Sequence, residues 1–330
     1  MVISRRLGVS IAVLALVALV AVGALVAFQR PPDYGTKVKD PTIGTGGAVV
    51  TYPNSYAQLS GYVLDTMNEE RAAAGSPPLT LSPAVSAQQH ADSMLYFGYF
   101  SHWDTQGLKP YMRYSLLNGT SAVFENVAWS HSPTIEFVDI SSAESAMEKL
   151  NFEMMYDDSI YQWGHRDAIL SPFHSRVSIG IAYNGTDLYL VEDFENSYGN
   201  LSVSYQDSGS SVTLSGALDP GVSPSSIAVY YDPPPVVLSP FKLMTNLTLA
   251  GSYDIGSYVG SVLPRCDQYC SGSPGNVTNA QVWNSTGPTY IQFSLQDLPG
   301  SAAPGVYTLY LQNLTGTIFT SLSVFVGPYG

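Results

Sequence analysis

Two histidines and two glutamates stand at separate places in the chain where their side chains could do chemistry. The four are His102 in GYFSHWD, Glu125 in AVFENVAWS, Glu153 in KLNFEMMYDD and His165 in YQWGHRDAIL. Imidazoles bind divalent metals and exchange protons near neutral pH, and carboxylates act as acids, bases or ligands. If the fold brings these segments together, they form a candidate catalytic or binding site.

Each of these residues also has a purely structural interpretation. A single histidine beside aromatic side chains, such as His102, usually makes structural hydrogen bonds. Glu125 is compatible with a helix-capping carboxylate, Glu153 with a solvated helix face and His165 with the N-terminal cap of a helix. The residues by themselves leave both interpretations open.

Helical patterns precede and follow the first histidine. Leu59, Val63 and Met67 recur at four-residue spacing and predict a helix that ends before Gly75. The segment LSPAVSAQQHADSMLYFG predicts a second helix, with its N-cap at residue 82 and a glycine stop at residue 98. His102 would then lie in the loop just beyond that helix.

A third helical pattern covers residues 141 to 157. Its apolar stripe consists of Ala143, Met147, Leu150 and Met154. Glu153 lies on the shoulder of this stripe, from which a carboxylate can reach the edge of a cleft. Glu148 points further away and is the second choice.

The period then changes from helical to alternating. VSIGIAYNGTDLYLVEDF predicts two strands joined by a two-residue turn at Asn184-Gly185. Helices first and no repeating strand-helix-strand unit indicate α+β layers rather than a doubly wound sheet. After Asn200 the short strands and turn residues predict an all-β, immunoglobulin-like sandwich, without histidine or any catalytic constellation. We interpret it as a spacer or adhesion module.

The N-terminus predicts a membrane segment. An uncharged apolar run from Gly8 to Phe28 follows Arg5 and Arg6, which favours a transmembrane helix with its N-terminus inside. We favour an uncleaved anchor over a signal peptide, so everything after Arg30 is expected outside the membrane. The expected organisation is an anchor or signal at 1–30, a linker at 31–54, an α+β domain at 55–197 and the sandwich at 198–330.

The composition indicates which partners are excluded and on which side of the membrane the protein lies. With 26 acidic and 13 basic residues the net charge is -13, which argues against nucleic acid. Cys266 and Cys270 predict a small disulfide loop outside the cytoplasm. Glycosylation sequons occur at Asn118, Asn184, Asn200, Asn246, Asn276, Asn284 and Asn313.

Three segments in a fixed order resemble a known family. FSHWD, FENVA and GHRDAIL are similar to the signature segments of the CAP superfamily, whose SCP-like domain is shared by cysteine-rich secretory proteins, antigen 5 and pathogenesis-related 1 proteins. The helical NEERAAAGSPPLTLSPAVSAQQHADSM and the closing hairpin also match, so the resemblance covers about residues 55 to 196. Without disulfide cysteines in this region, the chain resembles prokaryotic SCP proteins.

The resemblance implies a fold and a set of cleft residues. The fold is an α-β-α sandwich with an open cleft lined by two histidines and two glutamates. These are His102, Glu125, His165 and, less directly, Glu153, because Leu150 replaces the tryptophan that usually precedes the last one. Two imidazoles and two carboxylates in one groove could hold Zn²⁺ or another divalent cation, with His102 and His165 as ligands. Without metal they could form a hydrogen-bonded network.

Three functions compete at this stage. The first is a non-enzymatic surface module that binds an extracellular small molecule, lipid, glycan or protein in its cleft. The second is a hydrolase in which the same groove holds a metal that activates water. Against it, neither an H-E-x-x-H motif nor a G-x-S-x-G elbow is present. The third is an architectural protein. We expect the first.

Overall fold

The computed structural model describes residues 54–137, 139–206, 208–246, 249, 251–264, 276–298 and 303–327. The predicted anchor at 1–30, the linker up to residue 53 and the cysteines Cys266 and Cys270 lie outside these residues. Within the described ranges, no helix is both long enough and apolar enough to cross a membrane.

A four-stranded sheet forms the centre of the first domain. Its strands, in spatial order, are β1 (Thr80–Leu81), β3 (Arg176–Tyr183), β4 (Asp187–Asn196) and β2 (Ala122–His131). The short β1 runs parallel to β3, and the other neighbours are antiparallel. Because β2 pairs with β4 only, it is an edge strand of this sheet.

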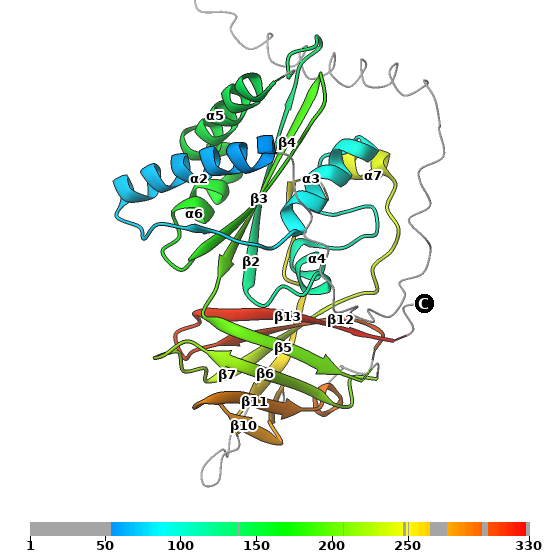
Figure 1. The fold of residues 1–330 in the computed structure, drawn as a ribbon. Helices are drawn as coiled ribbons and strands as arrows, with labels where there is room; N and C mark the ends of the chain where they lie inside the picture. The colour runs from blue at the N-terminus through cyan, green and yellow to red at the C-terminus, as the bar shows by residue number, and fades with distance from the viewer. Residues whose placement is uncertain are drawn as a thin grey trace, which may run out of the picture. The chain divides into compact units, whose positions relative to one another are not determined.

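Helices cover both faces of this sheet (Figure 1). One face carries α2 (Asn54–Ala74), α5 (Ile140–Tyr156) and α6 (Gly164–Leu170), and the other carries α3 (Ser86–Phe97) and α4 (Pro110–Leu116). The apolar stripes predicted from the sequence are buried on the first face, including Leu59, Met67 and Met147. The α-β-α layering and the α+β class are therefore as predicted.

Two local predictions were wrong. The second helix starts at Ser86 rather than beside Ser82, because the Ser82 amide donates to Val177 O at 2.8 Å and continues the strand pairing. The strand turn contains more than Asn184 and Gly185, since Tyr183 pairs with Leu188. In both places a tertiary or turn contact outweighs the local sequence signal.

The C-terminal strands form two sheets that share one core. One sheet has the order β10 (Val282–Asn284), β11 (Pro288–Phe293), β6 (Val212–Leu218), β5 (Gly199–Tyr205). The other has the order β13 (Ile318–Val326), β12 (Gly305–Gln312), β7 (Ser226–Asp232), β8 (Ser257–Leu263), β9 (Val277–Asn279). Apolar side chains of both sheets pack together, as expected for a sandwich. The immunoglobulin-like subtype stays a prediction.

The two domains are joined closely. The described residues of both domains fall into one compact unit, and only Ser197 and Tyr198 separate β4 from β5. The Ser323 amide donates to Ser115 Oγ at 3.0 Å, and Asn196 Nδ2 donates to Ile318 O at 2.9 Å. The chain therefore passes from the sheet of β4 to the sheet of β5 without a long connecting segment.

Candidate functional site

A cleft at the edge of the sheet collects three of the four predicted residues. His102, Glu125 and His165 all line a hollow of about 250 Å³ beside β2. Aromatic side chains complete much of its wall, namely Phe124, Tyr161 and Tyr253. Segments that are far apart in the sequence thus meet at one place.

The edge position of β2 explains how residues from both faces of the sheet reach one cleft. Side chains alternate along a strand, so Glu125 faces the α3 and α4 side, whereas Phe124 and Asn126 face the α2, α5 and α6 side. His102 comes from the loop after α3, and His165 comes from α6 on the opposite face. The two histidines approach around the unpaired edge of the strand.

Two buried side chains, Arg113 and His90, fix the loop that carries His102. Arg113 of α4 donates from Nη1 to His102 O at 2.7 Å and to Leu108 O at 3.0 Å. His90 of α3 bonds through Nε2 to Ser101 O at 2.8 Å. Burial and the nearby Arg113 lower the pKa of His90 well below its usual value, so its ring is neutral and donates.

Glu125 links His102 to Arg113. Its Oε1 lies 2.9 Å from His102 Nδ1, and its Oε2 accepts from Arg113 Nη2. Burial raises the pKa of Glu125 to about 7, although Arg113 acts in the opposite direction. Burial and Arg113 lower the pKa of His102 to about 3. The neutral imidazole therefore carries its proton on Nδ1 and leaves Nε2 as an acceptor.

A second carboxyl group lies behind Glu125. Asp193 of β4 is the register partner of Glu125, is buried, and accepts a hydrogen bond from Ser86 Oγ. Burial and the neighbouring Glu125 raise the pKa of Asp193 well above its ordinary value. Protonation of Asp193 removes the charge repulsion between the two carboxyl groups, so that Glu125 can stay ionised.

His165 has its own carboxylate partner, Asp158. Nδ1 of His165 lies 2.6 Å from Asp158 Oδ1, and the His165 amide donates to Oδ2 at 3.0 Å. Asp158 immediately precedes the short 3₁₀ turn Ser159–Tyr161 and is almost fully buried. The carboxylate orients the ring so that Nδ1 faces it and carries a proton, which in the neutral imidazole leaves Nε2 as an acceptor.

Asp158 is not among the site residues predicted from the sequence. It belongs to the paired aspartates of MMYDD, seven residues before His165. An aspartate immediately before a tight turn that leads into a histidine-bearing helix is the signal that could have identified it.

Asn126 joins the cleft to a further buried acid. Its Nδ2 donates to His165 O and to Glu192 Oε2, at 3.2 Å in each case. Burial raises the pKa of Glu192 to about 8. Glu192 Oε1 has no hydrogen-bond partner among the described residues. The amide of Asn126 thus fixes the start of α6 against β4.

Part of the chain is similar to a known protein family. The family model described as the cysteine-rich secretory protein family, CAP, matches residues 64–194. The chain contains a CAP domain. The match spans α3, the His102 loop, β2, α6 and the hairpin, which are the elements that build the cleft. No curated protein sequence matches the chain.

Two solved structures are similar to part of the chain. One is an extracellular protein containing an SCP domain from Bacillus anthracis str. Ames, with 21% identity and a TM-score of 0.31. The other is the CAP domain of Enterococcal PrgA, with 14% identity and a TM-score of 0.32. Each comparison covers 42% of this chain, and covers 41% and 60% of the other chain, respectively. The chain thus spans less than two thirds of either.

The structure does not bring Glu153 into the cleft of the CAP domain. Its side chain is 49% exposed, and its Oε1 lies 3.8 Å from Lys149 Nζ one helical turn earlier. Glu148, the second choice, is also exposed on α5. The carboxylate that pairs with His165 is instead Asp158, which is buried behind the ring and does not itself line the cleft.

The donor atoms at the cleft decide whether it fits a metal ion. Among the described residues, no group of three or more His, Cys, Asp or Glu side chains is arranged to hold a metal ion. The cleft offers the Nε2 atoms of His102 and His165, while the carboxylates are engaged behind the rings. Protein zinc sites use at least three protein ligands. The described residues therefore do not fit a preformed zinc site.

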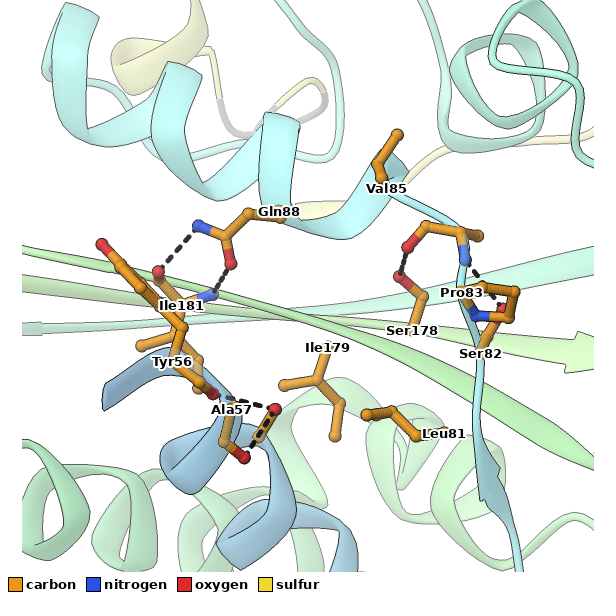
Figure 2. A pocket seen from close by; sticks show the side chains of 12 residues that line it. Tyr56, Ala57, Leu81, Ser82, Pro83, Val85, Gln88, Ser178, Ile179 and Ile181 are labelled. Carbon is orange, nitrogen blue, oxygen red and sulfur yellow. Dashed lines mark hydrogen bonds between the residues drawn. The ribbon is translucent and has the colours of Figure 1, made fainter. Parts of the chain in front are cut away.

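A second hollow of about 240 Å³ lies at the other edge of the sheet, between α2, β1, β3 and the start of α3 (Figure 2). Figure 2 shows the Gln88 amide bonded to both backbone groups of Ile181. The Ser178 hydroxyl donates to Ala84 O at 2.8 Å. Its lining contains no histidine or carboxylate. The polar groups hold α3 on β3, and none of the predicted site residues lies there.

Six of the seven sequon asparagines are exposed, and Asn313 is half-buried. Three of the exposed ones, Asn118, Asn184 and Asn200, belong to the CAP domain or the start of β5. All seven asparagines are at least partly accessible to solvent. Their glycosylation stays a prediction.

Proposed function

We propose that this protein is a non-enzymatic binding module that is displayed outside the cell membrane and held there by its N-terminal helix. Its CAP-domain cleft binds a compact, uncharged ligand that carries hydroxyl or amide N–H donors, such as one sugar unit of a cell-surface glycan. The observation that carries this proposal is the presence of two imidazoles in one cleft, each held by a carboxylate at Nδ1.

The tautomers define what the ligand must supply. With Nδ1 of His102 and His165 bonded to Glu125 and Asp158, both Nε2 atoms are left as hydrogen-bond acceptors. A ligand therefore gains most by donating N–H or O–H groups to them. Aromatic rings of Phe124, Tyr161 and other lining residues supply flat apolar surface beside these acceptors.

Size and charge narrow the ligand further. The cleft of about 250 Å³ is smaller than the ~300–1,000 Å³ typical of pockets for drug-sized ligands. Its lining contains neither lysine nor arginine, and Arg113 is already paired with Glu125. An anionic ligand would lack a counter-charge, whereas a neutral, ring-sized ligand meets no such penalty.

The hydrogen bonds leave neither carboxylate beside the two histidines free to act as a general base. Both oxygens of Glu125 are occupied, one by His102 and one by Arg113, and both oxygens of Asp158 bond to His165. A general base needs a free oxygen or nitrogen within reach of the proton it removes. The pKa of His102, lowered to about 3, makes its Nε2 a weak base at neutral pH.

The sequence also predicts a divalent cation as an alternative ligand of this cleft. Because the donor set does not fit a three-ligand centre, we expect only weak zinc binding through His102 and His165. No step of the proposed function requires a metal.

Display outside the membrane rests on two sequence features. The apolar run from Gly8 to Phe28 follows two arginines, and seven sequons occur after it. The exposure of most sequon asparagines agrees with this placement. We therefore keep the membrane anchor as part of the proposal.

The test is a ligand-observed NMR titration of the purified chain with N-acetylglucosamine and with glucose. His165→Leu removes one acceptor and should weaken binding roughly 2- to 10-fold, from ~0.5–1.5 kcal/mol per neutral hydrogen bond. His131→Leu is the matched control, because His131 lies at the far end of β2 and pairs with Asp187. Equal affinity in the His165 variant and the wild type would refute the proposal.

A further inference from the structure

The connection between β7 and β8 leaves the sandwich and packs on the CAP domain. It contains α7 (Pro240–Thr245), whose Leu243 and Met244 join the apolar cluster formed by α3 and β4. The Leu238 amide donates to Thr105 O at 2.9 Å, and the Phe100 amide lies 3.0 Å from Met244 Sδ. The connection therefore contacts the loop that carries His102 both before and after the histidine in the sequence.

A buried lysine fixes the end of this connection. Nζ of Lys109 lies 2.6 Å from Asp232 Oδ1 at the end of β7, and also bonds to the side chain and backbone oxygen of Asp254. Tyr111 donates its hydroxyl to Asp232 Oδ2 at 2.6 Å. Lys109 and Asp232 are both buried, whereas the Asp254 side chain is 81% exposed. The Lys109–Asp232 pair is thus the firm part of this anchor.

Directly before Asp254, the chain forms part of the cleft wall. Gly251, Ser252 and Tyr253 all line the cleft with His102. The rings of Tyr253 and His102 meet edge to face, with centroids 5.0 Å apart. Tyr253 Oη accepts a hydrogen bond of 2.9 Å from the Glu125 amide on the outer edge of β2.

A second contact holds the same wall. Trp103 donates from Nε1 to Ser252 O at 3.3 Å. Together with the Lys109 anchor, this contact places the wall from both ends of the described segment 251–254. The CAP-domain histidine motif FSHWD therefore binds the sandwich connection directly through its tryptophan.

We propose that Tyr253 is a specificity-determining residue of the cleft, so that the sandwich domain completes the binding site of the CAP domain. The inference rests on the proposed function. In this proposal the phenol ring, which meets the imidazole edge to face, closes this end of the cleft over His102. The closed end admits a compact ring and excludes a chain that continues on that side. The sandwich thereby selects single or terminal sugar units.

The first arm of the test needs no ligand. Diethyl pyrocarbonate modifies unprotonated imidazoles, and the lowered pKa of His102 keeps its ring unprotonated near neutral pH, so its modification rate reports access. His102 is only 6% exposed. Tyr253→Ala should raise its rate about tenfold, as for a group released from local protection, without changing the rate at His131.

Two variants separate the covering ring from general loosening. Tyr253→Phe keeps the ring and should leave the modification rate of His102 low. Tyr258→Ala removes a half-exposed tyrosine of β8 that does not line the cleft, and should behave as wild type. Thermal unfolding verifies that each variant is folded. An unchanged rate at His102 in folded Tyr253→Ala would overturn the proposal.

The second arm measures selectivity by ligand-observed NMR with N-acetylglucosamine and its linear tetramer. In Tyr253→Ala the ratio of tetramer to monomer affinity should rise about tenfold, equivalent to ~1.4 kcal/mol. An unchanged ratio would contradict a selective role for Tyr253. If neither sugar binds wild type or variant, the proposed ligand class fails, and the modification rates still decide whether Tyr253 covers His102.

Discussion

Ionisation of the buried Glu192 should lower the stability of this protein as pH rises. Glu192→Gln should remove this part of the pH dependence. Glu192 is fully buried, receives one hydrogen bond from Asn126, and has a pKa raised by burial to about 8 from an ordinary 4.5. A carboxyl group with a raised folded-state pKa binds its proton more tightly in the folded state than in the unfolded state. Its contribution to stability is therefore present at low pH and lost as pH rises.

The magnitude follows from the interval between the two pKa values. Each unit of difference corresponds to about 1.4 kcal/mol, so between about pH 5 and pH 8 this group alone should lower the free energy of unfolding by roughly 3 kcal/mol. Glu192→Gln keeps the shape and a hydrogen-bond acceptor for Asn126 but cannot ionise. The variant should match wild type near pH 5 and be more stable near pH 8.

The assay is urea unfolding of wild type and Glu192→Gln at several pH values. Other buried groups also titrate, including His102 and Glu125 in the cleft and His174 beside Phe194, but they are common to both proteins. The difference between the two curves isolates Glu192. Parallel curves from about pH 5 to pH 8 would refute a raised pKa for this group.

Three further predictions concern the contacts that hold the site. Arg113→Met leaves Glu125 buried without its cation and should lower the free energy of unfolding by about 3–5 kcal/mol, measured by urea unfolding. Adding Glu125→Gln should recover part of this loss. Strictly additive effects of the two substitutions would contradict the ion pair. Asp158→Asn removes the carboxylate that orients His165 and should change the ring tautomer, seen in imidazole nitrogen NMR; an unchanged tautomer would argue against the pair. Lys109→Met breaks the buried anchor and should increase amide hydrogen exchange in residues 251–254, whereas unaltered exchange would mean that the anchor does not hold this wall.

Much of the CAP domain could be predicted because its signals are local. Helical spacing marked α2 and α5, alternation marked β3 and β4, and the ordered motifs placed His102, Glu125 and His165 in one cleft. Their meeting point follows from the edge position of β2, which the sequence does not state. The family resemblance supplied that long-range information.

Three residues were wrongly placed or not predicted, because a periodic sequence pattern does not determine the direction or the long-range neighbours of a side chain. Glu153 is next to the buried Met154, and one residue of rotation on α5 is enough to expose its side chain. Asp158 lies in an irregular turn, where spacing does not predict direction. Tyr253 is 151 residues from His102 in the sequence, so only the three-dimensional structure brings their rings to 5.0 Å.

The most direct test of the central claim is an imidazole nitrogen NMR spectrum of the chain, recorded during a titration with N-acetylglucosamine. The two-acceptor cleft predicts that His102 and His165 both carry the proton on Nδ1, and that their Nε2 signals shift together as the sugar binds while His131 stays unchanged. A proton on Nε2 of either cleft histidine, or a sugar that binds without moving these two signals, would contradict it.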